Sequence, residues 1–189
     1  MLTPPQNLAE SSRNLHQRIA AAALAAGRSV DSITLLAVSK GQPVTAIETL
    51  ARLGQEHFGE NYLQEALPKI ASLRGLELSW HFIGQLQANK TRAVAENFQW
   101  VHTVDRLKLA QRLSAQRPAF APPLQVCLQV KLGNEPGKGG VLPAELPALA
   151  AAVQQLPGLR LRGLMCIPPA EDDAAAQRRW FAQLRELLL

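Results

Sequence analysis

Residues 33–43 read Ile-Thr-Leu-Leu-Ala-Val-Ser-Lys-Gly-Gln-Pro, an apolar run that ends at Lys40 and is followed by turn-forming residues. Such a run, bounded by Gly and Pro, predicts a buried strand over residues 33–39. Lys40 would then stand at the carboxyl end of the strand, where α/β barrels place their functional residues. Partial desolvation there would favour the neutral amine, the form that acts as a nucleophile in Schiff-base formation. On position alone, a surface lysine that starts a turn is the alternative.

The rest of the chain alternates between apolar runs and segments with helical spacing. Helical spacing over residues 8–26 ends at Gly27, and a second helix over residues 44–53 follows Pro43 and ends at Gly54. Further strands are expected at residues 57–59, 78–83, 100–104, 124–132 and 159–167, and further helices at 62–73, 89–96, 107–116, 144–155 and 173–189. The strands are mostly continuous apolar runs, which predicts a parallel sheet covered by helices.

Two architectures fit six strand–helix pairs: an open doubly wound sheet and a TIM (β/α)8-type barrel. The first strand is not followed by Gly-x-Gly-x-x-Gly, which argues against a dinucleotide-binding sheet. Polar residues gather after the strands, notably at 59–62, 102–106 and 133–140. Because barrels collect their functional groups at this end, we predict an α/β barrel domain over residues 1–189 with an extra N-terminal helix.

Composition indicates a globular protein, with 47% hydrophobic and 19% charged residues among 189. The chain has no apolar run long enough to cross a bilayer, and residues 1–6 do not resemble a signal peptide, so we expect a cytoplasmic protein. Cys127 and Cys166 lie in strand-like runs and are expected to be small buried hydrophobes. The net charge is +5, but the basic residues are scattered along the chain and many have an acidic residue nearby. This distribution argues against a nucleic-acid partner.

Several polar residues have alternative explanations. His57, His81 and His102 lie on neighbouring strands, but their spacing is not a metal-binding pattern, and no metal site is expected. Glu60 is either a general base or a carboxylate that caps the next helix. Residues 137–140 read Gly-Lys-Gly-Gly, which lacks the full phosphate-loop spacing and fits a flexible lid better.

Five motifs together resemble those of the pyridoxal phosphate homeostasis proteins, which are single-domain relatives of the alanine racemase barrel. The motifs are Ala-Val-Ser-Lys at 37–40, Phe-Gly-Glu-Asn at 58–61, Trp-His-Phe-Ile-Gly-x-Leu-Gln-x-Asn-Lys at 80–90, His-x-Val-Asp at 102–105 and Arg-Gly-Leu-Met-x-Ile-Pro at 162–168. The resemblance covers nearly the whole chain, and the motif at 80–90 is the most specific. It implies a cytoplasmic protein that buffers pyridoxal 5′-phosphate or delivers it to apo-enzymes, without firmly established turnover.

The resemblance also implies that Lys40 carries the cofactor as an internal aldimine. Asn61 and Met165, at the ends of two other strands, are expected to line the ring: Asn61 by bonding the pyridoxal hydroxyl or a water, and Met165 by packing on a ring face. Further cofactor-binding candidates are His81 and Gly84. Two lysines at the rim, Lys90 and Lys138, are expected to assist as point charges that attract the cofactor phosphate. No catalytic residue is assigned.

Two departures from the family are visible: Lys131 replaces an asparagine, and Gly139 replaces a serine. The family also continues into two more strands, which hold the cofactor phosphate. We therefore expect an incomplete barrel that further chain or a partner completes. Without those two strands, the 189 residues are expected to retain the cofactor weakly. The resemblance implies a monomer for the full-length family, so an oligomer is expected only if a partner completes the barrel.

Two other functions stay open at this stage. A racemase-like enzyme would need a second acid/base group, and the only tyrosine is Tyr62. A barrel-derived binding protein that has lost the cofactor is the third reading. An absorbance spectrum and α-proton exchange on an amino acid separate the three.

Overall fold

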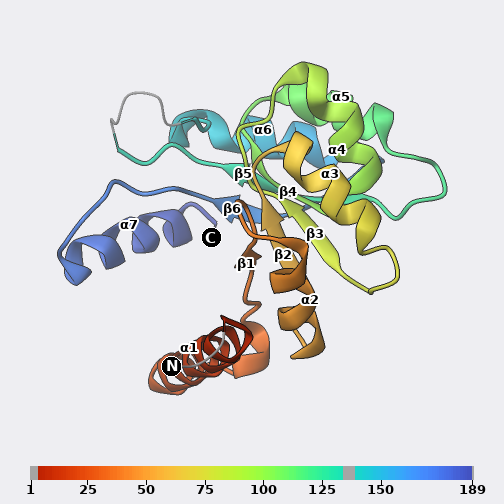
Figure 1. The fold of residues 1–189 in the computed structure, drawn as a ribbon. Helices are drawn as coiled ribbons and strands as arrows, with labels where there is room; N and C mark the ends of the chain where they lie inside the picture. The colour runs from red at the N-terminus through yellow and green to blue at the C-terminus, as the bar shows by residue number, and fades with distance from the viewer. Residues whose placement is uncertain (1–3, 134–138, 189) are drawn as a thin grey trace. The chain divides into compact units, whose positions relative to one another are not determined.

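The computed structural model describes residues 4–133 and 139–188 and consists of two compact units, Met1–Trp80 and His81–Leu189. Figure 1 shows that helices and strands alternate along the chain from the N-terminus to the C-terminus. This alternation confirms the six predicted strand–helix pairs.

The first unit contains the N-terminal helices and the first two strands. Its elements are α1 (Pro4–Ala25), a 3-10 turn (Val30–Ser32), β1 (Ala37–Val38), α2 (Val44–Arg52), β2 (His57–Glu60) and α3 (Leu63–Ser72), and the next strand, β3 (Ser79–Phe82), begins in it. Helices α1 and α2 end as predicted, because Gly27 and Gly54 take the positive φ angles of 64° and 90° that such endings favour.

β1 is shorter than the predicted strand over residues 33–39. Only Ala37 and Val38 pair with β2, in parallel, opposite Phe58 and Gly59. Upstream, the carbonyl of Leu35 accepts a hydrogen bond of 2.9 Å from the Gln55 side-chain amide. A side chain thus satisfies a backbone group that a longer strand would have paired, and the apolar run could not reveal this.

The second unit contains the longer strands. Its elements are a 3-10 turn (Ala88–Lys90), α4 (Thr91–Asn97), β4 (Trp100–Val104), α5 (Leu107–Gln116), β5 (Leu124–Gln129), a 3-10 turn (Pro143–Glu145), α6 (Leu146–Gln154), β6 (Leu159–Met165) and α7 (Ala174–Glu186). β3 pairs with β4, β4 with β5 and β5 with β6, all in parallel. The helix predicted to begin at Asp173 begins one residue later, because the Asp173 carboxylate caps it by accepting from the N–H groups of Ala175 and Ala176.

The core of the second unit lies against β4 and β5. Val101, Val126 and Leu128 are fully buried, and Phe82 meets Phe98 edge to face with 5.5 Å between ring centroids. Arg117 follows α5 and donates to the carbonyls of Ala95 and Phe98, which lie at the end of α4. On α5 itself, the Arg112 guanidinium donates to Thr91 Oγ1 of α4, so apolar packing and two guanidinium groups hold these helices together.

The two cysteines are free thiols, each only half-buried. Burial raises the pKa of Cys127 to about 11, although nearby Arg162 acts in the opposite direction. The Cys127 thiol is therefore neutral at physiological pH, in keeping with a packing role.

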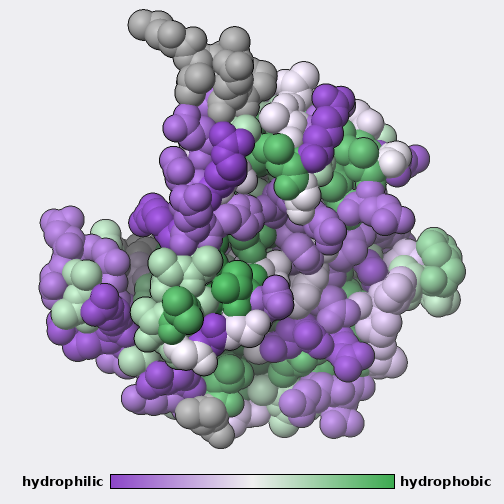
Figure 2. Space-filling model, turned by 90° about the horizontal axis from the view of Figure 1, so that it is seen from below, coloured by the Kyte–Doolittle hydropathy of each residue, from purple (hydrophilic) through white to green (hydrophobic). Residues whose placement is uncertain are grey.

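On the molecular face in Figure 2, hydrophobic side chains lie among hydrophilic ones. Within the described residues, no helix combines the length and the apolar character that a membrane crossing requires.

Candidate functional site

Lys40 and Asn61 lie level with each other just beyond the carboxyl ends of β1 and β2. Val38 pairs with Gly59, and the Ser39 N–H donates to the Gly59 carbonyl at 2.9 Å. Lys40 follows Val38 by two residues, and Asn61 follows Gly59 by two. The parallel register therefore brings together, in the first unit, two of the predicted cofactor-binding residues.

A tight turn presents Lys40. The Gln42 N–H donates to the Ser39 carbonyl at 3.0 Å, and Gly41 takes a φ of 70°, which favours glycine. The Lys40 side chain is exposed. The predicted position at the strand end is correct, whereas the exposed side chain does not show the predicted partial desolvation.

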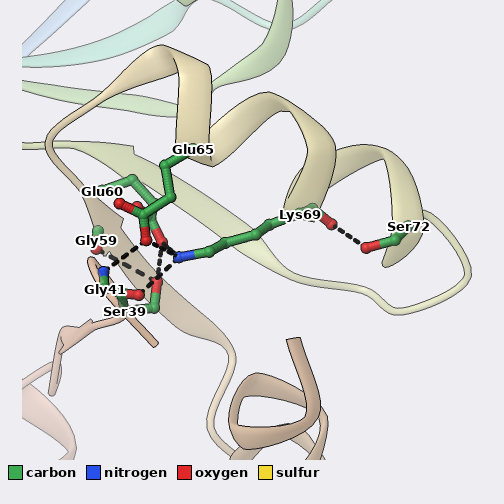
Figure 3. A network of polar contacts seen from close by, with 7 residues as sticks. All are labelled: Ser39, Gly41, Gly59, Glu60, Glu65, Lys69 and Ser72. Atoms are coloured by element: carbon green, nitrogen blue, oxygen red, sulfur yellow. Dashed lines mark hydrogen bonds and ion pairs between the residues drawn. The ribbon is translucent and has the colours of Figure 1, made fainter. Parts of the chain in front are cut away.

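A polar network surrounds the backbone on both sides of Lys40 (Figure 3). The Lys69 ammonium on α3 donates to the Ser39 carbonyl at 2.8 Å and to Glu60 Oε1 at 2.8 Å, and it also pairs with Glu65. Ser39 Oγ donates to the same Glu60 oxygen at 2.6 Å. Glu65 in turn accepts from the Gly41 N–H. Side chains of β2 and α3 therefore hold the backbone directly before and directly after Lys40.

The charges of this network stabilise one another. The hydrogen bond from Lys69 and then that from the Gly41 N–H hold the pKa of Glu65 below its ordinary value. Burial alone would lower the pKa of Lys69, but hydrogen bonds to the Glu60 and Glu65 carboxylates outweigh it and raise that pKa. Glu65 and Lys69 are therefore both charged throughout the neutral pH range.

Glu60 corrects a prediction from the sequence. The sequence is compatible with a general base or a helix cap, but Glu60 is the last residue of β2, is fully buried, and pairs with Lys69. The helix cap position belongs to Tyr62, whose side chain forms no capping hydrogen bond. Glu60 therefore serves as the buried counter-ion of Lys69.

Two buried oxygen atoms beside this network have no hydrogen-bond partner within the described residues: Glu60 Oε2 and Asn61 Oδ1. Buried polar atoms are rarely left unsatisfied, and each unpaired one calls for a ligand or a water. The Asn61 oxygen is an acceptor next to the Lys40 turn, so it suits a ligand that offers a hydroxyl donor.

The other predicted residues belong to the second unit. Met165 is the half-buried last residue of β6, and its carbonyl accepts from the Val130 N–H at 2.8 Å. Gly84 is buried just after β3, and its carbonyl accepts from Thr103 Oγ1 at 2.6 Å. Lys90 is the half-buried last residue of the 3-10 turn that precedes α4. Met165 and Gly84 thus lie at the carboxyl ends of their strands, as predicted.

His81 is buried and belongs to a cluster of rings with the half-buried Trp100 and His102. Its Nδ1 lies 2.8 Å from Nε2 of His102, and its ring stacks on Trp100 with 5.2 Å between centroids. Burial lowers the pKa of His102. The described residues contain no group of three His, Cys, Asp or Glu side chains that could hold a metal ion. The ring contacts and the short distance between their nitrogens pair these two histidines with each other, and the cofactor-binding role of His81 stays a prediction.

Lys138 and one neighbouring residue of the predicted 137–140 lid, Gly137, lie outside the described residues. Of the lid, Gly139 and Gly140 are described, and the Gly139 carbonyl accepts from the Gln129 side chain at 2.9 Å. The assisting role of Lys138 stays a prediction.

Sequence reasoning missed Lys69 and Glu65. Two signals pointed to them: the Glu–Lys spacing of four residues on a predicted helix, and the position of Lys69 three residues after Ala66 on the buried face. A lysine on an apolar face predicts a buried partner, but the sequence does not show which carboxylate supplies it.

These elements define a class of protein: a domain of parallel strands alternating with helices, with a lysine at the end of the first strand. The chain matches the family model of the alanine racemase N-terminal domain over residues 13–189. Alanine racemase from Corynebacterium glutamicum has the same fold, with a TM-score of 0.69 at 17% identity over 96% of this chain and 49% of that chain. The chain therefore has the alanine racemase N-terminal-like fold.

Closer relatives narrow the class. The chain is 59% identical to the pyridoxal phosphate homeostasis protein of Pseudomonas aeruginosa, over 96% of this chain and 79% of the relative, and 51% identical to that of Escherichia coli, over 90% and 74%. The structure of PipY from Synechococcus elongatus with pyridoxal phosphate bound matches with a TM-score of 0.77 at 41% identity, over 90% of this chain and 80% of that chain. The chain belongs to the family of pyridoxal phosphate homeostasis proteins, as its motifs predicted.

Proposed function

We propose that this protein binds pyridoxal 5′-phosphate as a Schiff base on Lys40 and carries it in the cytoplasm, as a store or for delivery to apo-enzymes. The observation that carries the proposal is the placement of Lys40 at the end of β1, level with Asn61, in a family that includes a member with this cofactor bound. No catalytic turnover is needed for this role.

The residues present fit the cofactor. Lys40 is exposed and, within the described residues, makes no side-chain hydrogen bond or ion pair, so its amine is accessible. The neutral amine attacks the aldehyde carbon, and one water leaves as the C=N bond forms, so no oxidant or reductant is required. Asn61 Oδ1, buried and without a partner, is suited to accept a hydrogen bond from the pyridoxal hydroxyl or from a water beside it. The roles assigned to Met165, His81, Gly84 and Lys90 stay predictions.

The test is a titration of the protein with pyridoxal phosphate, followed by absorbance in the imine band. The wild type is expected to develop the band, and Lys40→Arg to lose it, since arginine keeps the charge but does not form the imine. Lys108→Arg is the matched control, because Lys108 is an exposed lysine of α5. A band of equal strength in Lys40→Arg would contradict the proposal.

The carrier role is separated from racemase-like turnover by α-proton exchange. Tyr62, the only tyrosine, is 63% exposed at the start of α3, and the chain supplies no other tyrosine as a racemase base. We expect the loaded protein to transfer cofactor to an apo-enzyme without exchanging the α-proton of alanine in deuterated water. α-Proton exchange at an enzymatic rate would contradict the carrier role and show that the protein is an enzyme.

A further inference from the structure

Both peptide groups that flank Lys40 are held by side chains of one helix, α3. The carbonyl of the Ser39–Lys40 peptide accepts from Lys69, and the N–H of the Lys40–Gly41 peptide donates to Glu65. Glu65 and Lys69 are one helical turn apart and pair with each other. The orientation of the Lys40 main chain is therefore fixed from α3, although α3 itself supplies no predicted cofactor ligand.

The buried end of the network is rigid. The side chains of Glu60 and Lys69 are 0% and 8% exposed, and Glu60 Oε1 accepts from both Ser39 Oγ and Lys69 Nζ. A buried ion pair with additional hydrogen bonds resists rearrangement, because movement of either group leaves the other charge unpaired. Glu65, by contrast, is one-third exposed and forms the outer end of the network.

We propose that Glu65 and Lys69 are positioning residues for Lys40, which set the direction of its amine so that the imine with pyridoxal phosphate forms readily. This inference rests on the proposed function of Lys40. A lysine on an unbraced turn would lose conformational entropy whenever the imine forms, whereas a braced turn has lost most of it beforehand. The network therefore favours the covalent step by fixing the backbone on both sides of Lys40.

Glu65 is the residue to change, because its removal leaves the Glu60–Lys69 pair intact. Glu65→Ala removes the acceptor for the Gly41 N–H, and Glu65→Gln keeps an oxygen in its place. Glu96→Ala is the matched control, since Glu96 also forms an i,i+4 ion pair, with Arg92 on α4 of the second unit at 3.6 Å, and has no part in the hydrogen bonds that hold the Lys40 turn.

Two ligands separate positioning from a general structural effect. Pyridoxal 5′-phosphate forms the imine, whereas pyridoxine 5′-phosphate has an alcohol in place of the aldehyde and binds without it. We expect Glu65→Ala to bind pyridoxal phosphate about tenfold more weakly, the effect of losing roughly one hydrogen bond to a charged group. Pyridoxine phosphate should bind Glu65→Ala as it binds the wild type, Glu65→Gln should recover most of the loss, and Glu96→Ala should behave as wild type.

Three outcomes decide the proposal. If Glu65→Ala forms the imine as tightly as the wild type, the positioning role is wrong although the function of Lys40 stands. If both ligands lose affinity equally, Glu65 is only structural. If the wild type itself forms no borohydride-reducible adduct on Lys40, the proposed function fails, and the positioning role fails with it.

Discussion

The strand ends around Lys40 and the strands of the second unit are stabilised in opposite ways. β1 has two residues, and charged side chains of β2 and α3 hold the turn that follows it. β5, by contrast, pairs with β6 along its whole length and buries Val126 and Leu128 completely. Strand pairing and apolar packing fix the second unit, whereas side-chain hydrogen bonds and charges fix the Lys40 turn.

The difference shows where this fold places its chemistry. A turn that presents an exposed amine buries little apolar surface, so hydrophobic packing does not define its conformation. Directional hydrogen bonds to the backbone on both sides of Lys40 fix the conformation of the turn instead. The comparison predicts that the two regions respond differently to substitution and to pH.

The largest effect is expected for Lys69→Met, which leaves the fully buried Glu60 carboxylate without its counter-ion. Removal of one partner of a buried pair costs about 3–5 kcal/mol, which urea denaturation would measure. The double variant Glu60→Leu with Lys69→Met replaces both charges with apolar groups and should recover most of the loss. A change below about 0.5 kcal/mol in Lys69→Met, the range of ordinary surface substitutions, would show that the pair is not buried as described.

Leu128→Ala tests the opposite region. Leu128 is fully buried on β5, so its truncation leaves a cavity and should lower the free energy of unfolding by about 2–5 kcal/mol. Because no charge is involved, the loss should be the same at pH 5 and pH 8 by urea denaturation. A loss that varied strongly with pH would contradict the division between an apolar and a polar region.

The sequence predicted the second unit better than the Lys40 region. The bounds of β4 and α5 agree with the structure, because apolar spacing reports elements that apolar packing stabilises. The predicted strand over residues 33–39 was too long, since the Gln55 side chain takes the Leu35 carbonyl, a long-range contact that periodicity does not contain. The position of Lys40 followed from the strand end and the motif, but the roles of Glu60 and Lys69 depend on three-dimensional pairing.

Asn61→Ala tests whether a polar side chain beside the Lys40 turn contributes to cofactor binding rather than to stability. The Asn61 oxygen has no partner within the described residues, so its removal should change the unfolding free energy little. Affinity for pyridoxal phosphate should fall about tenfold, the equivalent of one hydrogen bond of roughly 1.4 kcal/mol. Fluorescence titration measures the affinity. Unchanged affinity would remove Asn61 from the site.

The smallest expected effect is the change in the Gly41 amide signal as the Glu65 carboxylate titrates with pH. The pKa of Glu65 lies below its ordinary value of 4.5, so its contribution to stability is present above 4.5 and is lost as the pH falls through the lowered value. The pKa of Lys69 is raised above 10.5, so its contribution is present below 10.5 and is lost only as the pH rises through the raised value. The network is therefore complete throughout the neutral range.

Nuclear magnetic resonance follows this titration directly. The Gly41 amide proton, which donates to Glu65, should shift with a midpoint below 4.5, and the shift should disappear in Glu65→Gln. A midpoint above 4.5 would mean that neither Lys69 nor the Gly41 N–H stabilises the Glu65 carboxylate.

The identity of the lysine that carries the cofactor tests the central claim most directly. The protein is loaded with pyridoxal phosphate and reduced with borohydride, which fixes the imine, and the modified peptide is then located by mass spectrometry. We predict that the adduct lies on Lys40, with no comparable modification of Lys69, Lys90 or Lys108. An adduct found mainly on any other lysine would contradict the account.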